Sequence, residues 1–330
     1  MRLLQLLLIG LTASLALAWA ATAPTSALKF HPGHYVSLNL EDAPDVMRTL
    51  AQPGIRGVQV RYTWRSLEPE RDHYDFSRID ADLRLASSLG LHFVAFIEDK
   101  SFNSDEHLLP DYLADKALPF TRGGYVAKRW DPFVVERFGA LFDALGARFD
   151  QHPDFEGIAL QESAMGFSAD VAREQNYTPE AYRDALIEIL TRARQALPSS
   201  QIFWYMNFLE GGQKYLADIA TAVIPLHIAM GGPDVLPNNP ALARLTYPLY
   251  ARFAGQLTLF NSMQYNSFAH RHANPLAHTK YWTLQELLDF ARDELHVSYL
   301  FWNHKTWRKP LDSWNWDDAL IVIRKNPELP

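Results

Sequence analysis

Eight short apolar runs, rich in β-branched and aromatic residues, recur along this chain at the spacing of strands that alternate with helices. Most of the runs are apolar along their whole length, as parallel strands are when both faces of their sheet are covered. The pattern predicts an α/β protein with a single domain, a TIM (β/α)8 barrel. The runs cover residues 34–40, 57–62, 91–97, 157–161, 201–207, 224–230, 257–263 and 298–302.

Segments with a helical period lie between these runs. Residues 79–86, 134–149 and 182–193 carry apolar side chains every three or four positions. Thr178 precedes a proline, and Thr283 has Glu286 three residues further on, so both threonines are expected to be N-caps. The alternative to a barrel is a doubly wound open sheet, which is disfavoured because no glycine-rich phosphate loop follows the first strand.

Residues 1–20 have the composition of a secretory signal peptide. Arg2 precedes an apolar stretch, and residues 18–20 read AWA, a small-x-small cleavage site. A retained membrane anchor is the alternative, but the apolar stretch is short for a helix that spans a bilayer. We therefore expect a periplasmic or secreted protein, with no stable membrane anchor after cleavage and a barrel domain of residues 21–330.

Charge and motifs exclude several function classes. The chain has 38 acidic and 31 basic side chains, which gives no electrostatic reason to bind nucleic acid. It has no dinucleotide-binding glycine motif, P-loop or Gly-x-Ser-x-Gly motif, so no cofactor is expected. His270 and His272 lack a third ligand at a confirming spacing, and no metal site is expected. We expect a monomer.

The longest connection between the predicted elements covers residues 103–132. It contains Pro110, Pro119, the pair Gly123 and Gly124, and several aromatic residues, a composition typical of an ordered loop. Loops that follow barrel strands form the active face, so this loop is expected to form one wall of a cleft. An ordinary surface excursion is the alternative.

Residues 62–80 read YTWRSLEPERDHYDFSRID. This segment resembles the second strand and helix of the retaining (β/α)8 glycoside hydrolases, in the clan that includes cellulases and β-galactosidases, where an aromatic, W-x-x-L-E-P, Y-D-F and I-D recur. Residues 130–132 and 152–158 similarly resemble the stretch that leads into the fourth strand of that clan, which here ends in residues 161–163, QES. The resemblance covers residues 62–166, is architectural beyond them, and implies a barrel that acts on carbohydrate.

The resemblance implies that Glu162 is the general acid that protonates a glycosidic oxygen. The chemistry of the position agrees, because a carboxyl at the end of an apolar strand lies at the barrel mouth, where partial loss of water favours its protonated form. The clan usually has Asn before this Glu, and the longer Gln161 would shift any contact to a sugar hydroxyl. A structural Glu162 paired with Arg61 or Lys100 is the alternative.

The clan places its nucleophilic Glu at the end of the seventh strand, but residues 260–266, FNSMQYN, contain no carboxylate. Gln264 cannot form a glycosyl ester, so a retaining mechanism needs a carboxylate from elsewhere. A separation of about 6.5–9.5 Å from Glu162 would predict inversion, and about 5–5.5 Å retention. Other predicted strand ends offer Glu98, Asp99, Glu210 and Asp234.

We favour Asp99 as the second carboxylate. Glu98 and Asp99 directly follow an apolar strand, and one member of such a pair should face the cleft. A surface ion pair between Asp99 and Lys100 is the alternative.

Aromatic, amide and basic side chains gather at several predicted strand ends, as expected for a sugar cleft. Flat rings stack on the C–H faces of pyranoses, and amides and histidines bond the hydroxyls. Trp302 also resembles a Trp that the clan often has at the end of its eighth strand, although a single tryptophan is more often part of the core. The expected substrate-binding residues are Arg61, Trp64, Lys100, Gln161, Tyr205, Asn207, Gln264, Trp302, Asn303 and His304, with Trp307 close by.

Two functions fit these features. One is an exported glycoside hydrolase that acts on a polysaccharide or oligosaccharide, with Glu162 as general acid and a displaced second carboxylate. The other is a catalytically inactive barrel that binds glycans at the cell envelope. The enzyme is favoured because buried acids at strand ends tend to be functional.

Overall fold

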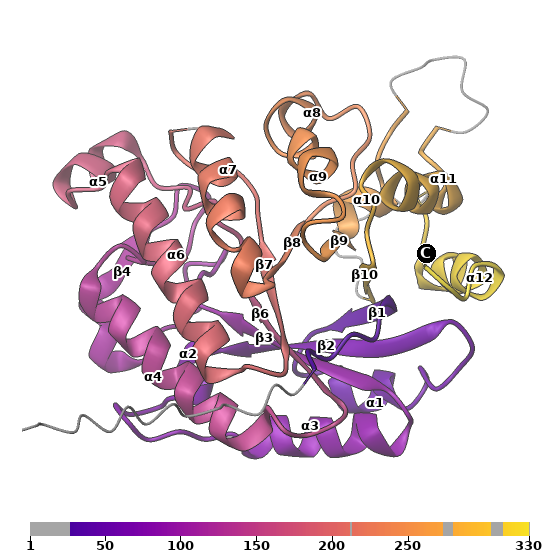
Figure 1. Cartoon of the computed structure of the whole chain (residues 1–330), viewed down its shortest axis with the longest axis horizontal. Coiled ribbons are helices and arrows are strands. Elements are labelled where there is room, and N and C mark those ends of the chain that lie inside the picture. The colour runs from indigo at the N-terminus through magenta and orange to yellow at the C-terminus, as the bar shows by residue number, and fades with distance from the viewer. Residues whose placement is uncertain (1–26, 212, 273–279, 305–312, 330) are drawn as a thin grey trace, which may run out of the picture.

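The computed structural model describes residues 27–211, 213–272, 280–304 and 313–329. Its eight parallel strands close into a barrel in the order β1-β10-β9-β8-β7-β6-β3-β2 (Figure 1). Each predicted run contributes one strand, which confirms the TIM (β/α)8 barrel. The strands are β1 (Gly33–Leu38), β2 (Ile55–Thr63), β3 (His92–Glu98), β6 (Phe155–Leu160), β7 (Gln201–Tyr205), β8 (Ala229–Gly232), β9 (Leu259–Met263) and β10 (Tyr299–Asn303).

The sixth predicted run, residues 224–230, forms a strand only at its end. Ile224–Leu226 is a 3-10 turn that contains Pro225, and His227 follows with a φ of 49° in the left-handed region. Proline cannot donate a hydrogen bond to a strand ladder, so the chain turns here before β8 begins at Ala229. Apolar composition alone does not separate such a turn from a strand.

Helices follow the strands and surround the barrel, and α4 and α6 lie side by side on one flank (Figure 1). Both predicted N-caps are confirmed, because Thr178 accepts a hydrogen bond from Ala181 N and Thr283 forms a capping box with Glu286. The helices are α1 (Ala43–Met47), α2 (Trp64–Leu67), α3 (Ser77–Ser88), α4 (Pro132–Phe149), α5 (Ala169–Glu174), α6 (Pro179–Ala196), α7 (Gln213–Ala222), α8 (Pro240–Leu245), α9 (Tyr247–Phe253), α10 (Tyr265–Phe268), α11 (Leu284–Asp289), continued by a π-helical turn at Phe290–Glu294, and α12 (Trp316–Lys325).

The long connection after β3 is ordered, as expected. It holds a 3-10 helix at Asp111–Lys116 and an antiparallel pair of short strands, β4 (Ala117–Pro119) and β5 (Tyr125–Ala127). A bridge between Lys100 and Val126 joins this pair to the end of β3. The loop therefore belongs to the carboxyl end of the barrel.

The apolar core has two layers. Outward-facing strand residues pack against the helices, and a separate cluster fills the barrel itself with rings in edge-to-face contact, such as Phe203 and Phe301 with centroids 5.2 Å apart. The inner cluster consists of Tyr35, Val94, Phe96, Ala159, Phe203, Tyr205, Ala229, Phe260, Tyr299 and Phe301. The barrel is thus a packed core rather than a pore, and ligands can approach only its ends.

Residues 27–32 run across the amino end of the barrel before β1. Lys29 Nζ donates to Asp150 O and to Phe155 O, both at 2.7 Å, and Lys29 N donates to Ser199 O. These contacts fix the start of the described chain at the end of the barrel opposite to the strand ends that carry Glu162.

Among the described helices, none combines the length and the apolar composition needed to cross a membrane. The predicted signal peptide, residues 1–20, lies outside the described residues.

The packing of α4 on α6 generates a stability prediction from two glycines of α4. A Cβ at Gly146 would lie 2.0 Å from Ala196 O, a backbone atom, whereas a Cβ at Gly139 would meet only the flexible side chain of Arg192 at 3.0 Å. We expect Gly146→Ala to lower the free energy of unfolding by about 1–3 kcal/mol through overpacking. Gly139→Ala should be neutral or stabilising by up to about 1 kcal/mol, because alanine favours helix. Urea denaturation of both variants measures the difference, and equal effects would contradict the packing argument.

Candidate active site

Glu162 follows β6 at the carboxyl end of the barrel. Its side chain is 18% exposed, and its two oxygens accept hydrogen bonds from Lys100 Nζ at 2.8 Å and from the Asn207 amide. An ammonium and an amide donor both stabilise the ionised carboxylate. Both carboxylate oxygens of the expected proton donor are therefore engaged by hydrogen-bond donors of the protein.

Asp234 follows β8 and has a different environment. Burial and the nearby charge of Glu162 raise the pKa of Asp234 to about 7, against a smaller opposing effect of a hydrogen bond from Asn266. Although the residue is partly accessible, its Oδ1 is shielded from solvent and has no hydrogen-bond partner among the described residues. Near neutral pH a large fraction of this carboxyl holds a proton.

These residues come from neighbouring strands. The barrel order places β6, β7, β8 and β9 side by side, and their ends carry Glu162, Asn207, Asp234 and Asn266 respectively. Asn207 contacts Glu162 while Asn266 contacts Asp234. Two carboxyls in different environments, one paired with an ammonium and the other with a raised pKa, thus lie in one row of strand ends, an arrangement typical of acid–base sites.

Asp99 does not lie at the mouth, contrary to its expected catalytic position. Its carboxylate forms a bidentate ion pair with Arg129, at 2.7 Å to both Nε and Nη2, and both side chains are almost completely buried. The pair lines a small cavity between the barrel and helices α4 and α6, together with Phe138 and Leu186. Because side chains alternate along a strand, Glu98 points into the barrel mouth and Asp99 points outward.

Gln161 and Lys100 are also buried rather than open to a ligand. Gln161 Oε1 accepts from the backbone N–H groups of Asp99 and Lys100, and its Nε2 donates to Lys100 O at 2.8 Å. Lys100 Nζ donates to Glu162 and to Ala164 O, and the residue is 1% exposed. The expected role of both residues as direct sugar contacts does not fit this burial.

Arg61, Glu98 and Tyr205 form the floor of the mouth. Arg61 donates to Glu98 at 2.8 Å, and its guanidinium lies 4.8 Å from the ring centre of Phe96. Burial raises the pKa of Glu98, and the adjacent Arg61 opposes this shift. Tyr205 is 3% exposed and bonds Ser262 and Gln59 inside the barrel, so it supports the floor and does not offer a stacking face.

Trp64 and Trp302 are core residues, which corrects their expected binding role. Both are fully buried. Trp64 contacts Phe138 in a tilted arrangement, with ring centroids 4.1 Å apart, and donates to Glu68, while Trp302 faces the helices and donates to His34 at 3.0 Å. The indole N–H groups find partners in the outer layer, so neither ring can stack on a sugar.

Three further expected residues, Asn303, Gln264 and His304, lie near the mouth. Asn303 takes the inward-facing position after Phe301 on β10, and Gln264 is the partly buried N-cap of α10. The His304 ring contacts Trp316 in a tilted arrangement, with ring centroids 5.2 Å apart. Trp307 lies outside the described residues.

The barrel mouth also carries exposed aromatic residues that the sequence does not identify. Four described aromatic side chains are at least 36% exposed, and three of them, Phe102, Phe208 and Tyr265, follow β3, β7 and β9. The fourth, Phe30, lies at the amino end of the barrel. No local pattern distinguishes an exposed ring from a buried one, and only position relative to a strand end could have identified these three.

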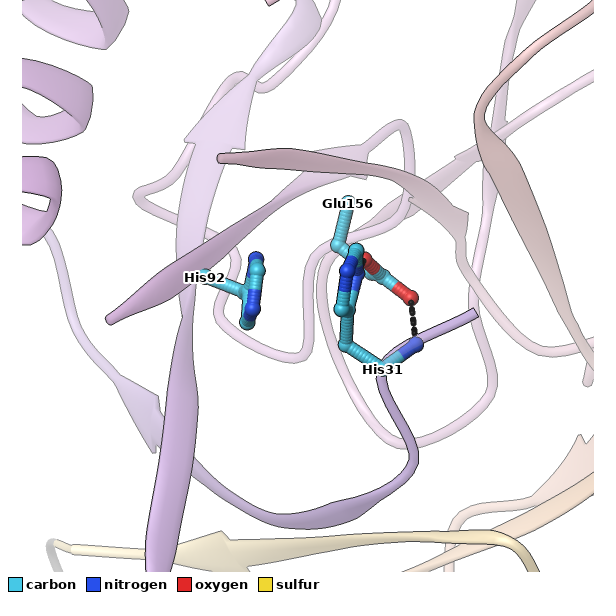
Figure 2. Close-up of side chains that lie close together, drawn as sticks. All are labelled: His31, His92 and Glu156. Carbon is cyan, nitrogen blue, oxygen red and sulfur yellow. Dashed lines mark hydrogen bonds and ion pairs between the residues drawn. The ribbon is translucent and has the colours of Figure 1, made fainter. Parts of the chain in front are cut away.

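A second cluster of titratable groups lies at the opposite end of the barrel. Figure 2 shows His31, His92 and Glu156, whose potential metal-ligating atoms lie within 4.8 Å of one another. The two imidazoles stack with centroids 3.8 Å apart and an interplanar angle of 15°. Because an imidazole binds a metal in its own plane, two such nearly parallel rings do not converge on one ion. His31 Nδ1 instead bonds Glu156 at 2.7 Å and fixes the amino-terminal segment.

His270 and His272, the pair considered above as metal ligands, contact other groups of the protein. His270 Nε2 contacts Pro237 O, and His272 stacks on Trp282 with ring centroids 4.3 Å apart.

Comparison with known proteins gives similarity at the level of the fold. No family model and no curated protein matches the chain. The catalytic domain of a β-amylase from Paenibacillus polymyxa superposes over 92% of this chain and 100% of its own length, with a TM-score of 0.61 and 9% identity. A β-galactosidase from the psychrophilic Marinomonas ef1 gives 0.58 over 88% at 10% identity, and a xylanase from Paenibacillus barcinonensis gives 0.53 over 89% at 11% identity.

The chain spans 58% of the β-galactosidase and 95% of the xylanase. The resemblance to (β/α)8-barrel glycoside hydrolases is therefore confirmed for the architecture, and at these identities it shows the fold alone. What the site does must follow from its own residues.

The raised pKa of Asp234 predicts a pH-dependent stability difference. An aspartate in an unfolded chain has a pKa of about 3.9. The folded protein therefore binds the proton more tightly, and its stability falls as pH rises from about 4 to about 7. Asp234→Asn removes this cost, so the variant should exceed the wild type by about 2–4 kcal/mol at pH 8, at about 1.4 kcal/mol per pKa unit, with no difference near pH 4.

Urea denaturation at pH 4, 6 and 8 checks this, with the exposed Asp105→Asn as control. A constant difference between wild type and Asp234→Asn at all three pH values would show that Asp234 titrates normally.

Proposed function

We propose that this protein is an exported glycoside hydrolase that cleaves a polysaccharide or oligosaccharide, with Asp234 and Glu162 as its catalytic carboxyls. The observation that carries the proposal is the contrast between them: two acids in one row of strand ends, one with a pKa of about 7 and the other bonded to an ammonium and an amide. Glycosidic bond cleavage needs such a pair, one carboxyl to give a proton and one carboxylate to act on the opposite face of the sugar.

In this proposal Asp234, rather than Glu162, gives the proton to the glycosidic oxygen. Its pKa is suited to a group that must be protonated before the reaction and ionised after it. Glu162, which is paired with Lys100, either accepts the proton of the attacking water or bonds to the anomeric carbon. Proton NMR of the first product separates the two cases, because the first inverts the anomer and the second retains it.

Polar and aromatic groups around the pair support a carbohydrate as the substrate. Asn207 Oδ1, Glu210 Oε2 and Asp234 Oδ1 are buried oxygens without hydrogen-bond partners among the described residues, and all three follow β7 or β8. Such acceptors suit the hydroxyl donors of a sugar. The exposed rings of Phe102, Phe208 and Tyr265 offer flat apolar faces for the pyranose C–H groups.

Export remains part of the proposal through the predicted signal peptide of residues 1–20. A glycan-binding protein without hydrolysis is the competing function, favoured by Gln264 at the end of β9, where the clan has its nucleophile.

The catalytic pair is tested by single substitutions. Asp234→Asn and Glu162→Gln should each lower kcat by about 10²–10⁴-fold on any glycan that the wild type hydrolyses. The wild-type kcat/KM should decline as pH rises through about 7, because Asp234 must be protonated in the free enzyme. Reducing-end assays over pH 4–9 measure both effects, and the exposed Glu106→Gln serves as control. Glycan binding without turnover in the wild type would establish the competing function.

The aromatic residues at the mouth are tested separately. Phe102→Ala, Phe208→Ala and Tyr265→Ala should each raise KM about two- to tenfold, since an aromatic contact contributes about 0.5–1.5 kcal/mol. Phe30→Ala is a matched control, because this ring is 51% exposed but lies at the other end of the barrel. If Phe30→Ala weakened binding as much as the other three, stacking at the mouth would not be the cause.

A further inference from the structure

We propose that the buried Asp99–Arg129 ion pair, with Tyr182, positions Glu162 by holding the main chain of residues 162–163. This inference rests on the proposed function, since it assigns positioning residues to the proposed catalytic carboxylate. None of these three side chains reaches the mouth, so they act through Glu162 and are not catalytic residues themselves.

The first step is the contact of Arg129 with the backbone. Arg129 Nη1 donates to Glu162 O at 2.7 Å, while Nε and Nη2 of the same guanidinium are occupied by Asp99. The bidentate pair fixes the plane of the guanidinium and so aims Nη1 at the carbonyl. Glu162 is thereby held through its own main chain from behind the strand.

Tyr182 of α6 extends the same contact by one residue. Its hydroxyl donates to Ser163 O at 2.7 Å and accepts from Arg129 Nη1 at 3.2 Å. Two successive carbonyls, of Glu162 and Ser163, are therefore bonded to buried side chains that come from different parts of the chain. The backbone at this point cannot move without breaking both contacts.

Lys100 is held by the same group of residues. Asp99, which pairs with Arg129, precedes Lys100 directly, and Gln161 bonds the backbone N–H and the carbonyl of Lys100. Lys100 and Glu162, whose side chains form the ion pair, therefore extend from backbones that are joined to each other through Gln161. The 2.8 Å contact between Nζ and Oε1 is the result of this arrangement.

The burial of the ion pair supports a positioning role. Both residues are 3% exposed and border a cavity lined mainly by apolar residues such as Ile97 and Leu190. Taking two charges out of water is costly, and apolar residues of similar volume often replace such a pair without loss of stability. What apolar residues cannot supply is a directed hydrogen bond to Glu162 O.

Tyr182→Phe is the mildest test, because it removes one hydroxyl and leaves the ion pair intact. Tyr35→Phe is the matched control: Tyr35 is also fully buried, and its hydroxyl donates to a carbonyl, His31 O at 2.9 Å, at the opposite end of the barrel. We expect similar small decreases in Tm for both variants. Only Tyr182→Phe should lower kcat, by about ten- to a hundredfold, with little change in KM.

A second readout needs no substrate. Burial lowers the pKa of Lys100, and the contact with Glu162 has the opposite effect. Arg129 and Asp99 are the other charged groups nearby. If Tyr182→Phe loosens the contact with Glu162, the pKa of Lys100 should fall below its wild-type value. NMR titration of protein with labelled lysine side chains measures this in wild type, Tyr182→Phe and Tyr35→Phe.

The outcomes separate the two proposals. A fall in the Lys100 pKa in Tyr182→Phe alone supports the positioning role even if no glycan is hydrolysed, in which case only the proposed function fails. A Lys100 pKa that is unchanged in Tyr182→Phe, or that shifts equally in Tyr35→Phe, would falsify the positioning role. So would a kcat that falls equally in both variants, which would reflect stability alone.

Discussion

Closure of the parallel sheet is the constraint on which the candidate site depends. Because all eight strands run the same way, every carboxyl end opens on one face of the barrel. Large inward-facing rings, among them Phe203, Phe260 and Phe301, fill the interior and keep the strands in this arrangement. Residues separated by dozens of positions in the sequence, such as Glu162 and Asp234, thereby become neighbours.

The chemistry of this face depends on two carboxyl groups, those of Glu162 and Asp234, that lie in different environments. Glu162 receives an ammonium and an amide, and Asp234 receives one amide, a buried position and the repulsion of Glu162. The negative charge that Lys100 stabilises on one carboxyl is also part of what keeps the proton on the other. The ion pair of Glu162 with Lys100 and the raised pKa of Asp234 are thus parts of one arrangement.

The fold could be predicted from the sequence because burial of strands on both faces leaves a strong, local composition signal. The site could be predicted only in part, because the direction of a side chain depends on an alternation with a period of two. Glu98 and Asp99 are adjacent, and a shift of one residue exchanges which of them enters the mouth. Trp64 and Trp302 also follow or end strands, but both turn toward the helices. Asp234 was one of four candidates, and its burial beside Glu162 is a tertiary property that no local pattern carries.

The segment of residues 27–32 fixes the start of the described chain at one pole of the barrel. Lys29 and His31 bind this segment to the amino end of the barrel. Their hydrogen bonds go to Phe155 and Glu156 of β6 and to Tyr299 of β10. Residue 27, where the described chain begins, therefore lies at the pole opposite to Glu162 and Asp234. Immobilisation through that side leaves the opposite pole open to a large polymer approaching from solution.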